Sequence, residues 1–190
     1  NRAVRRDDPD FLVPAVFRGE ALQQRVGGRR EADFERTVNR VFAHPVEVDH
    51  ATGTANRNEA RQGVDELAGR QLMAMVEPFV CHRLDGRVRN DLSPDAVGRA
   101  VAVASGLGRT SAYTWLKLPV VEDMYRVLSA STIPALLLGG EVSEDPDQTY
   151  ATWQAALRHP AARGLVIGRA VLYPADGDVE SAVDTVVGLL

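Results

Sequence analysis

Lysine is almost absent from this chain. Its 190 residues include one lysine, Lys117, beside twenty-one arginines. An excess of arginine is typical of GC-rich coding, so the scarcity of lysine by itself excludes little. Its position is informative, because Lys117 interrupts the apolar, β-prone run of residues 112–119. A buried ammonium is costly unless it is paired, and desolvation favours the neutral amine that attacks carbonyl carbons. The competing interpretation is a lysine that snorkels to solvent or pairs with a carboxylate.

Cysteine and long apolar runs are also scarce, which bounds the class of protein. Cys81 is the single cysteine, so no intramolecular disulfide forms and a reducing compartment fits best. The four histidines show no metal-ligand spacing, and we expect neither a metal nor a cofactor. No apolar run reaches the roughly eighteen residues of a transmembrane helix. The charged start of the chain lacks a signal-peptide core, and its first residue, Asn1, suggests a processed or incomplete chain.

The remaining composition is that of an ordinary globular enzyme. Hydrophobic residues make up 45% of the chain and charged residues 25%. The net charge of −4 gives no reason to expect nucleic acid as a partner, and nothing indicates a membrane. We therefore expect a cytoplasmic protein.

From about residue 71 the sequence repeats a strand followed by a helix. The expected strands are apolar runs, the first from residue 72 to an end near Pro78 and the others at residues 112–119, 132–140 and 164–169. The expected helices are amphipathic: one from Ser93 to Gly106 or Gly108, one of about ten residues from Val121, and two at 143–159 and 178–190, with Ser93 and Ser143 as N-caps. Continuous apolar strands between such helices indicate parallel strands buried on both faces. The fold class is α/β, either a doubly wound sheet or part of a (β/α)8 TIM barrel.

The first seventy residues do not continue this pattern. They offer a helix at 32–42, a short strand at 46–50 and a helix at 56–67, separated by charged and glycine-bearing stretches. We expect some of this segment to be poorly ordered. The predicted organisation is an irregular segment over residues 1–70 and an α/β unit over residues 71–190.

Chemistry-bearing residues follow the ends of the four predicted strands. Catalytic groups of parallel α/β proteins collect at those ends. In strand order they are Glu77, Lys117, Gly139-Gly140 and Gly168-Arg169. Glycine turns let backbone N–H groups approach a phosphate, and an arginine adds a charge-assisted contact.

Each of these residues also has a plainer interpretation. The two glycines suit a tight turn without any ligand. Arg169 can pair with Asp176 or Asp178, and Glu77 with an arginine. The order of the four signals along successive strands is what favours a site.

That order resembles the class I aldolase group of (β/α)8 barrels, which includes archaeal-type fructose-bisphosphate aldolase and deoxyribose-phosphate aldolase. In that group strand six carries the Schiff-base lysine, strand seven ends in Gly-Gly, and strand eight ends in Gly-Arg beside the phosphate. The matching stretches here are residues 115–119, 138–141 and 166–169. Over the longer stretches 106–119 and 164–174, the sequence is similar to a little-characterised bacterial branch of that group, which is associated with sugar or inositol breakdown.

The resemblance implies a partial barrel and a Schiff-base site. A full barrel needs about 250 residues, and the four units match strands five to eight by order. Asp49-His50 is similar to the end of the branch's first strand, which leaves strands two to four largely absent. The second lysine of deoxyribose-phosphate aldolase is missing here. Proton transfer therefore falls to Glu77 first, then to Tyr113, Asp49 or water.

The resemblance also implies a partner, a phosphorylated sugar or keto acid. A 2-deoxy-5-keto-gluconate phosphate and fructose bisphosphate both fit. A second interpretation is a truncated, non-catalytic half-barrel or structural subunit in which Lys117 only pairs with Glu77. Open strand edges and an exposed interior would then favour a homo-oligomer. A third interpretation is an isomerase or decarboxylase that works by acid–base chemistry alone.

Overall fold

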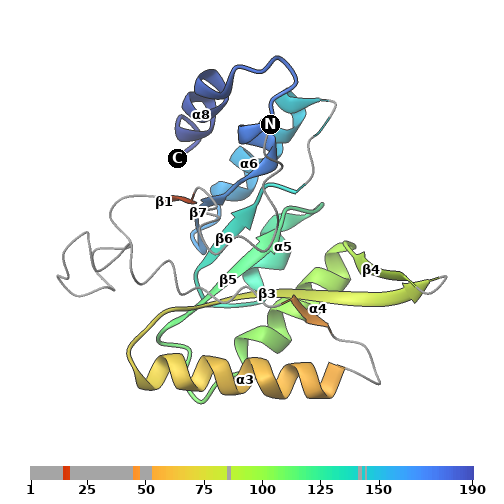
Figure 1. Ribbon diagram of the computed structural model, residues 1–190, viewed down its shortest axis with the longest axis vertical. Helices are drawn as coiled ribbons and strands as arrows, with labels where there is room; N and C mark the ends of the chain where they lie inside the picture. The colour runs from red at the N-terminus through yellow and green to blue at the C-terminus, as the bar shows by residue number, and fades with distance from the viewer. Residues whose placement is uncertain (1–14, 18–44, 48–52, 85–86, 141–142, 144) are drawn as a thin grey trace, which may run out of the picture.

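The computed structural model describes residues 15–17, 45–47, 53–84, 87–140, 143 and 145–190. The expected helix at 32–42 and the residues Asp49 and His50 lie outside this part of the chain. The α/β character predicted from the sequence is confirmed, since one sheet is flanked by helices (Figure 1).

The described part of the sheet consists of seven strands. They are β1 (Ala15–Phe17), β2 (Pro45–Glu47), β3 (Ala74–Leu84), β4 (Arg87–Asp91), β5 (Thr114–Pro119), β6 (Ala135–Leu138) and β7 (Ala162–Val166). Their order is β1-β7-β6-β5-β3-β2, and β4 pairs with β3 off this path. Strands β2, β3, β5, β6 and β7 are parallel along the sheet, whereas β1 runs antiparallel to β7 and β4 antiparallel to β3. The four expected strands thus form one parallel run, with β2 occupying the place next to β3.

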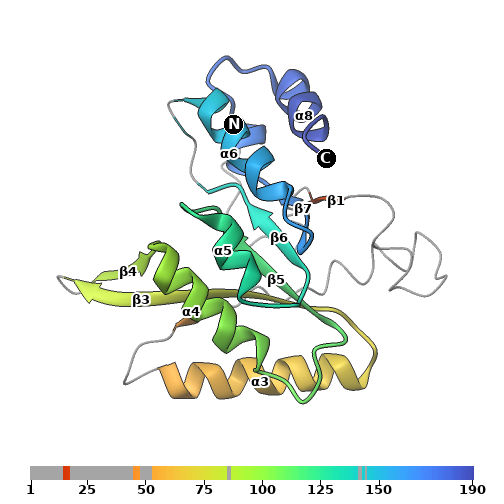
Figure 2. The ribbon, with the colours of Figure 1, turned by 180° about the vertical axis from the view of Figure 1, so that it is seen from behind.

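Helices lie between or after the parallel strands and cover one face of the sheet (Figure 2). They are α3 (Gly53–Gly69), α4 (Pro94–Ser105), α5 (Met124–Ser129), α6 (Pro146–Leu157), α7 (Arg169–Leu172) and α8 (Val179–Val187). Alternate residues of each strand point into this helix-covered layer. Leu116 and Leu118 of β5, for example, join Leu137 and Leu165 in the main core. Val64 of α3 belongs to the same core.

The opposite face of the sheet carries a second, smaller apolar cluster. Its members are Met73, Met75, Trp115, Leu136 and Val166, and all are buried. This face corresponds to the interior of a barrel. An exposed interior, expected for a half-barrel, is therefore not found at these residues. The sheet is also extended on both sides of the parallel run, by β1 next to β7 and by β2 next to β3.

Strand β3 is longer than the sequence predicted. The expectation that it ends near Pro78 is wrong, because the strand continues to Leu84 and its later residues pair with β4. We call the paired segments 80–84 and 87–91 the β3–β4 hairpin. It projects from the edge of the molecule (Figure 1). Its base is fixed by Val80, which packs against Ala96 and Ala100 of α4.

The helix starts follow local capping chemistry. Ser93 is the N-cap of α4, as predicted, and its side chain accepts from the Ala96 N–H. The prediction of Ser143 as the cap of α6 is wrong. Asp145 caps that helix by accepting from the Gln148 N–H, and the Ser143 hydroxyl bonds the Asp145 backbone instead. Within the described residues no helix is long and apolar enough to cross a membrane.

Candidate active site

Lys117 lies next to Glu77 across two neighbouring parallel strands. Strands β3 and β5 pair in the register Val76 to Leu116, so the following residues of each strand are adjacent. The Lys117 Nζ is 3.3 Å from the Glu77 Oε2. Their side chains are 18% and 17% exposed, respectively. The sequence therefore named two residues, forty positions apart, that the fold joins as a largely buried ion pair.

The ion pair stands on the barrel-interior face of the sheet. Leu116 and Leu118, which flank Lys117, are buried in the helix-covered core, so Lys117 points the other way. On that side it follows Trp115 of the interior cluster and pairs in register with Leu136. An ammonium bordered by apolar side chains is stabilised by its carboxylate partner, because removal from water penalises an unpaired charge.

Pro78 explains why the described pairing of β3 with β5 ends just before the ion pair. The Ala74 N–H donates to the Tyr113 carbonyl, and every second N–H of β3 faces β5 in a parallel ladder. Residue 78 would therefore donate to the carbonyl of Lys117, but proline has no N–H. The described pairing of β3 with β5 accordingly ends at Val76. Pro78 is fully buried, and its missing N–H accounts for the end of this pairing.

Tyr113 is not brought to the ion pair. It precedes the first residue of β5, whereas Lys117 is the fourth residue of that strand. Four residues of strand correspond to about 13 Å. Tyr113 thus lies toward the opposite end of β5, and Glu77 is the acid–base candidate that the structure places beside the amine. Asp49, the third candidate, lies outside the described residues.

Gly139 follows β6 at the same edge of the sheet as Lys117, and packing accounts for its identity. A Cβ at this position would lie 2.7 Å from the Ile167 Cγ2. Any side chain here would force apart the ends of β6 and β7. The absence of a side chain therefore serves close strand packing, whether or not a ligand approaches.

Gly140 and Arg169 meet at the ends of β6 and β7. Gly140 has φ +70°, a conformation that favours glycine. The Arg169 Nη2 donates to the Gly140 carbonyl at 3.3 Å, and Arg169 is exposed. Gly168, the N-cap residue of the short helix α7, has open space around the position of a Cβ. The predicted phosphate-binding residues thus share one edge of the sheet.

The two aspartates that offered Arg169 a plainer role take part in local backbone contacts. The Asp176 Oδ1 accepts from the Asp178 N–H, and the Asp178 Oδ1 accepts from the Ser181 N–H at the start of α8. Both carboxylates therefore have a structural function in the turn before α8.

Sequence reasoning missed one contact that steadies the approach to β5. Asp65 of α3 accepts from the Arg109 N–H at 2.7 Å and lies 3.4 Å from the Arg109 Nε. A Cβ on Gly108 would collide with Val64 and come close to Asp65. The loop that leads into the Lys117 strand is therefore clamped to α3. The motif over residues 106–109 was visible in the sequence, but its partner forty-four residues upstream was not.

Among the described residues, no group of three or more His, Cys, Asp or Glu side chains is arranged to hold a metal ion. The arrangement that is present, one amine beside one carboxylate at the carboxyl ends of parallel strands, is suited to covalent chemistry with a carbonyl compound.

The fold places this chain among the α/β proteins, and its architecture is similar to the TIM barrels of solved fructose-bisphosphate aldolases. An archaeal fructose-1,6-bisphosphate aldolase, solved with its catalytic lysine bound to the carbinolamine intermediate, superposes with a TM-score of 0.62 at 18% identity. That match covers 81% of this chain and 62% of the other. A fructose-bisphosphate aldolase from Slackia heliotrinireducens gives a TM-score of 0.58 at 16% identity, over 83% and 56% of the two chains. At these identities the likeness concerns the fold alone.

The chain belongs to the Cgl0159-like family, whose profile matches residues 25–187. The crystal structure of Cgl0159 from Corynebacterium glutamicum is 49% identical, with a TM-score of 0.72. The match covers 76% of this chain and 48% of that one, so the present chain spans about half the length of this relative. A comparison with curated proteins found no significant match.

Proposed function

We propose that this chain performs class I aldolase chemistry, cleaving or forming a C–C bond through a Schiff base on Lys117. The observation that carries the proposal is the Lys117–Glu77 pair, with 3.3 Å between Nζ and Oε2, at the carboxyl ends of parallel strands. The fold shared with Schiff-base aldolases supports it. The substrate class is a phosphorylated sugar or keto acid. Fructose bisphosphate, which appears in the names of those structural neighbours, is one example.

Glu77 serves as the proton carrier in this scheme. In the ion pair the amine is an ammonium without a lone pair, so its proton passes first to the Glu77 Oε2. Nζ then attacks the carbonyl carbon to form a carbinolamine. Glu77 gives this proton to the oxygen, takes the second proton from nitrogen and delivers it to the same oxygen, which leaves as water, and an iminium remains.

The iminium accepts the electrons of the breaking bond. The hydroxyl proton of the leaving fragment passes to Glu77, an aldehyde departs, and the electron pair of the C–C bond moves to the iminium to give an enamine. Protonation of the enamine carbon by Glu77 restores an iminium. Water then hydrolyses the iminium, which releases the second fragment and the amine of Lys117.

The phosphate is assigned to the turn residues beside this pair. Gly140 and Gly168 have open space beside them after β6 and β7, Gly139 leads into this turn, and Arg169 brings a guanidinium to Gly140. Binding the remote phosphate there would position the carbonyl over Lys117. A 2-deoxy-5-keto-gluconate phosphate, in keeping with inositol breakdown, is the finer proposal, and the described residues do not favour it over fructose bisphosphate.

Borohydride trapping tests the proposal directly. The protein is incubated with ketose and deoxy-keto-acid phosphates, reduced, and analysed by intact mass and peptide mapping. We expect an adduct on the peptide that contains Lys117. Lys117→Arg keeps the positive charge for Glu77 but lacks the primary amine, so it should give no adduct. Glu77→Gln should trap at least about a hundredfold more slowly, because proton transfer is typically worth that factor or more.

A structural role for Lys117 is the second candidate, and the same ion pair favours it. A lysine that only neutralises Glu77 would be replaced by arginine with little loss of stability and would form no adduct with any substrate. Absence of trapping from folded wild-type protein across the whole panel would therefore overturn the aldolase proposal and leave the non-catalytic half-barrel. An adduct of equal yield on Lys117→Arg would also overturn it, because the reactive amine would then lie elsewhere.

A further inference from the structure

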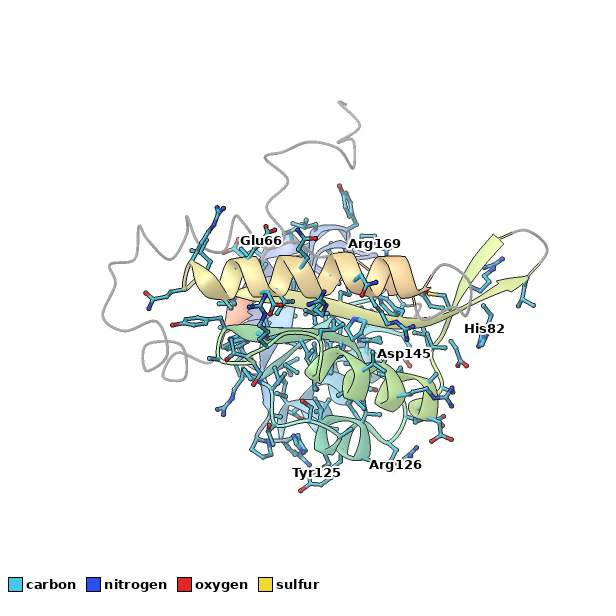
Figure 3. The ribbon with its side chains drawn as sticks, turned by 90° about the horizontal axis from the view of Figure 1, so that it is seen from below. Glu66, His82, Tyr125, Arg126, Asp145 and Arg169 are labelled. Atoms are coloured by element: carbon cyan, nitrogen blue, oxygen red, sulfur yellow. The ribbon has the colours of Figure 1, made fainter. Side chains whose placement is uncertain are left out.

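We propose that β4 of the β3–β4 hairpin pairs antiparallel with β4 of a second copy of this chain, about a two-fold axis at Asn90. The inference concerns an interaction surface and is independent of the chemistry at Lys117. The hairpin extends beyond the body of the molecule in two perpendicular views (Figures 1 and 3). Among the described strands, β4 pairs with β3 alone, so its other edge has no described strand beside it.

The sequence of β4 allows only one register for such a pair. A two-fold axis perpendicular to the sheet places one residue of β4 opposite itself, and its neighbours opposite each other. An axis at Arg87, at Arg89 or at Asp91 sets like charges face to face, and an axis at residue 88 sets Arg87 against Arg89. Like charges directly opposite each other destabilise a strand pair.

An axis at Asn90 leaves no like charges directly opposite each other. It places Arg89 of each copy opposite Asp91 of the other, which gives two symmetric opposite-charge pairs. It also places Leu92, which is 51% exposed, opposite residue 88 of the second copy. Charged residues on an edge strand usually discourage pairing. Here their alternation leaves a single self-complementary arrangement.

The side chains at the proposed axis are held in place within one copy. The Asn90 Oδ1 accepts from the Cys81 Sγ at 3.2 Å, and the Asp91 Oδ2 lies 3.3 Å from the His82 Nε2. The Asp91 Oδ1 accepts from the Ser93 N–H, which lowers the pKa of this carboxyl and keeps it charged. Asp91 is therefore an anion held in a fixed position on β4, where Arg89 of the second copy would meet it.

Charge reversal tests the register. A contact through one short strand is small, so the dimer is expected to be weak and is measured by analytical ultracentrifugation up to about 200 µM. Arg89→Asp sets a new carboxylate against Asp91 at both symmetric contacts and should weaken the dimer roughly tenfold or more. Asp91→Arg should do the same through two arginine pairs. An equimolar mixture of the two variants restores both opposite-charge pairs and should dimerise like the wild-type protein, while circular dichroism checks that each variant is folded.

Cysteine cross-linking tests the position of the axis. Asn90 lies opposite Cys81 in the hairpin, so Cys81 is first replaced by alanine to prevent an internal disulfide. Under mild oxidation Cys81→Ala with Asn90→Cys should form a covalent dimer. The matched control, Cys81→Ala with His82→Cys, puts an exposed cysteine on the inner strand of the same hairpin and should stay monomeric. A wild-type monomer at the highest concentration, a dimer unaffected by Arg89→Asp, or equal cross-linking of the control would each overturn the proposal.

Discussion

At the scale of residues, neighbouring glycines are required for different physical reasons. Gly139 and Gly140 are consecutive, and both were predicted as phosphate-binding turn residues. A side chain at Gly139 is excluded by Ile167, whereas Gly140 has a left-handed backbone and open space around it. Gly168 has neither constraint. The tendency of glycine to accept any of these roles is general, but only the neighbouring atoms reveal which one applies.

Gly139→Ala should destabilise the protein by about 1–3 kcal/mol, because its Cβ overlaps Ile167 and the ends of two strands must move. The measurement is urea unfolding at pH 7. Gly98→Ala in α4 is the control, since no atom lies within 4 Å of its Cβ position and alanine suits a helix. Equal losses for the two variants would show that the Ile167 contact is not the cause.

Asp91 should titrate below the usual range of aspartate. The Ser93 N–H lowers its pKa most, followed by the Ser93 side chain and His82. A lowered folded-state pKa makes the charged carboxylate stabilising above the unfolded value of about 3.9, and this contribution is lost as the pH falls through the folded-state pKa. Carboxyl-carbon NMR of the folded protein provides the midpoint. A midpoint at or above about 3.9 would contradict the described contacts.

At the scale of elements, regular strands and caps follow from local sequence, while their lengths do not. The apolar run of β5 and the Ser93-Pro94 start of α4 were both predicted correctly. Strand β3 was expected to stop at Pro78, because proline cannot donate to a ladder. The strand continues because its later residues pair with β4, and that partner comes afterwards in the chain. Helix α5 is likewise shorter than predicted, since Asp123 adopts a left-handed conformation before it.

Asp145→Ala should cost about 1 kcal/mol of stability through the loss of the N-cap of α6. Its carboxylate accepts from the Gln148 N–H and also complements the positive end of the helix dipole. Ser143→Ala is the matched control and should cost less, because its hydroxyl bonds the Asp145 backbone and not the helix. Thermal unfolding of both variants decides between the two caps. A larger effect of Ser143→Ala would restore the original expectation.

At the scale of the whole molecule, the two faces of the sheet have separate roles. The helix-covered face holds the main core, and the other face carries the apolar cluster below the ion pair of Lys117 and Glu77. Alternation along each strand assigns side chains to one face or the other. A charged pair can therefore sit beside a stable core without disrupting it. The boundary predicted at residue 70 stays a prediction, although Val64 on its N-terminal side packs into the main core.

Leu137→Ala should destabilise the whole domain by about 2–5 kcal/mol, because Leu137 is fully buried in the main core and its loss leaves a cavity. Val183→Ala on α8 is the control, since that side chain is 39% exposed and surface substitutions usually change stability by less than about 0.5 kcal/mol. Urea unfolding measures both variants. Similar values for the two would mean that the main core does not carry the stability of the domain.

The sequence by itself determined the alternation of strands and helices, the α/β class and the position of Lys117 in a buried strand. These depend on local signals, namely apolar runs, caps and glycine turns, that lie within a few residues of each other. Only the tertiary structure decided that Glu77 is the partner of Lys117, that Tyr113 is remote from it, and that β4 forms an outer edge. Each of these depends on which strands pair and in what register. Pairing joins residues forty positions apart, as at Glu77 and Lys117, through hydrogen bonds that no single stretch of sequence contains.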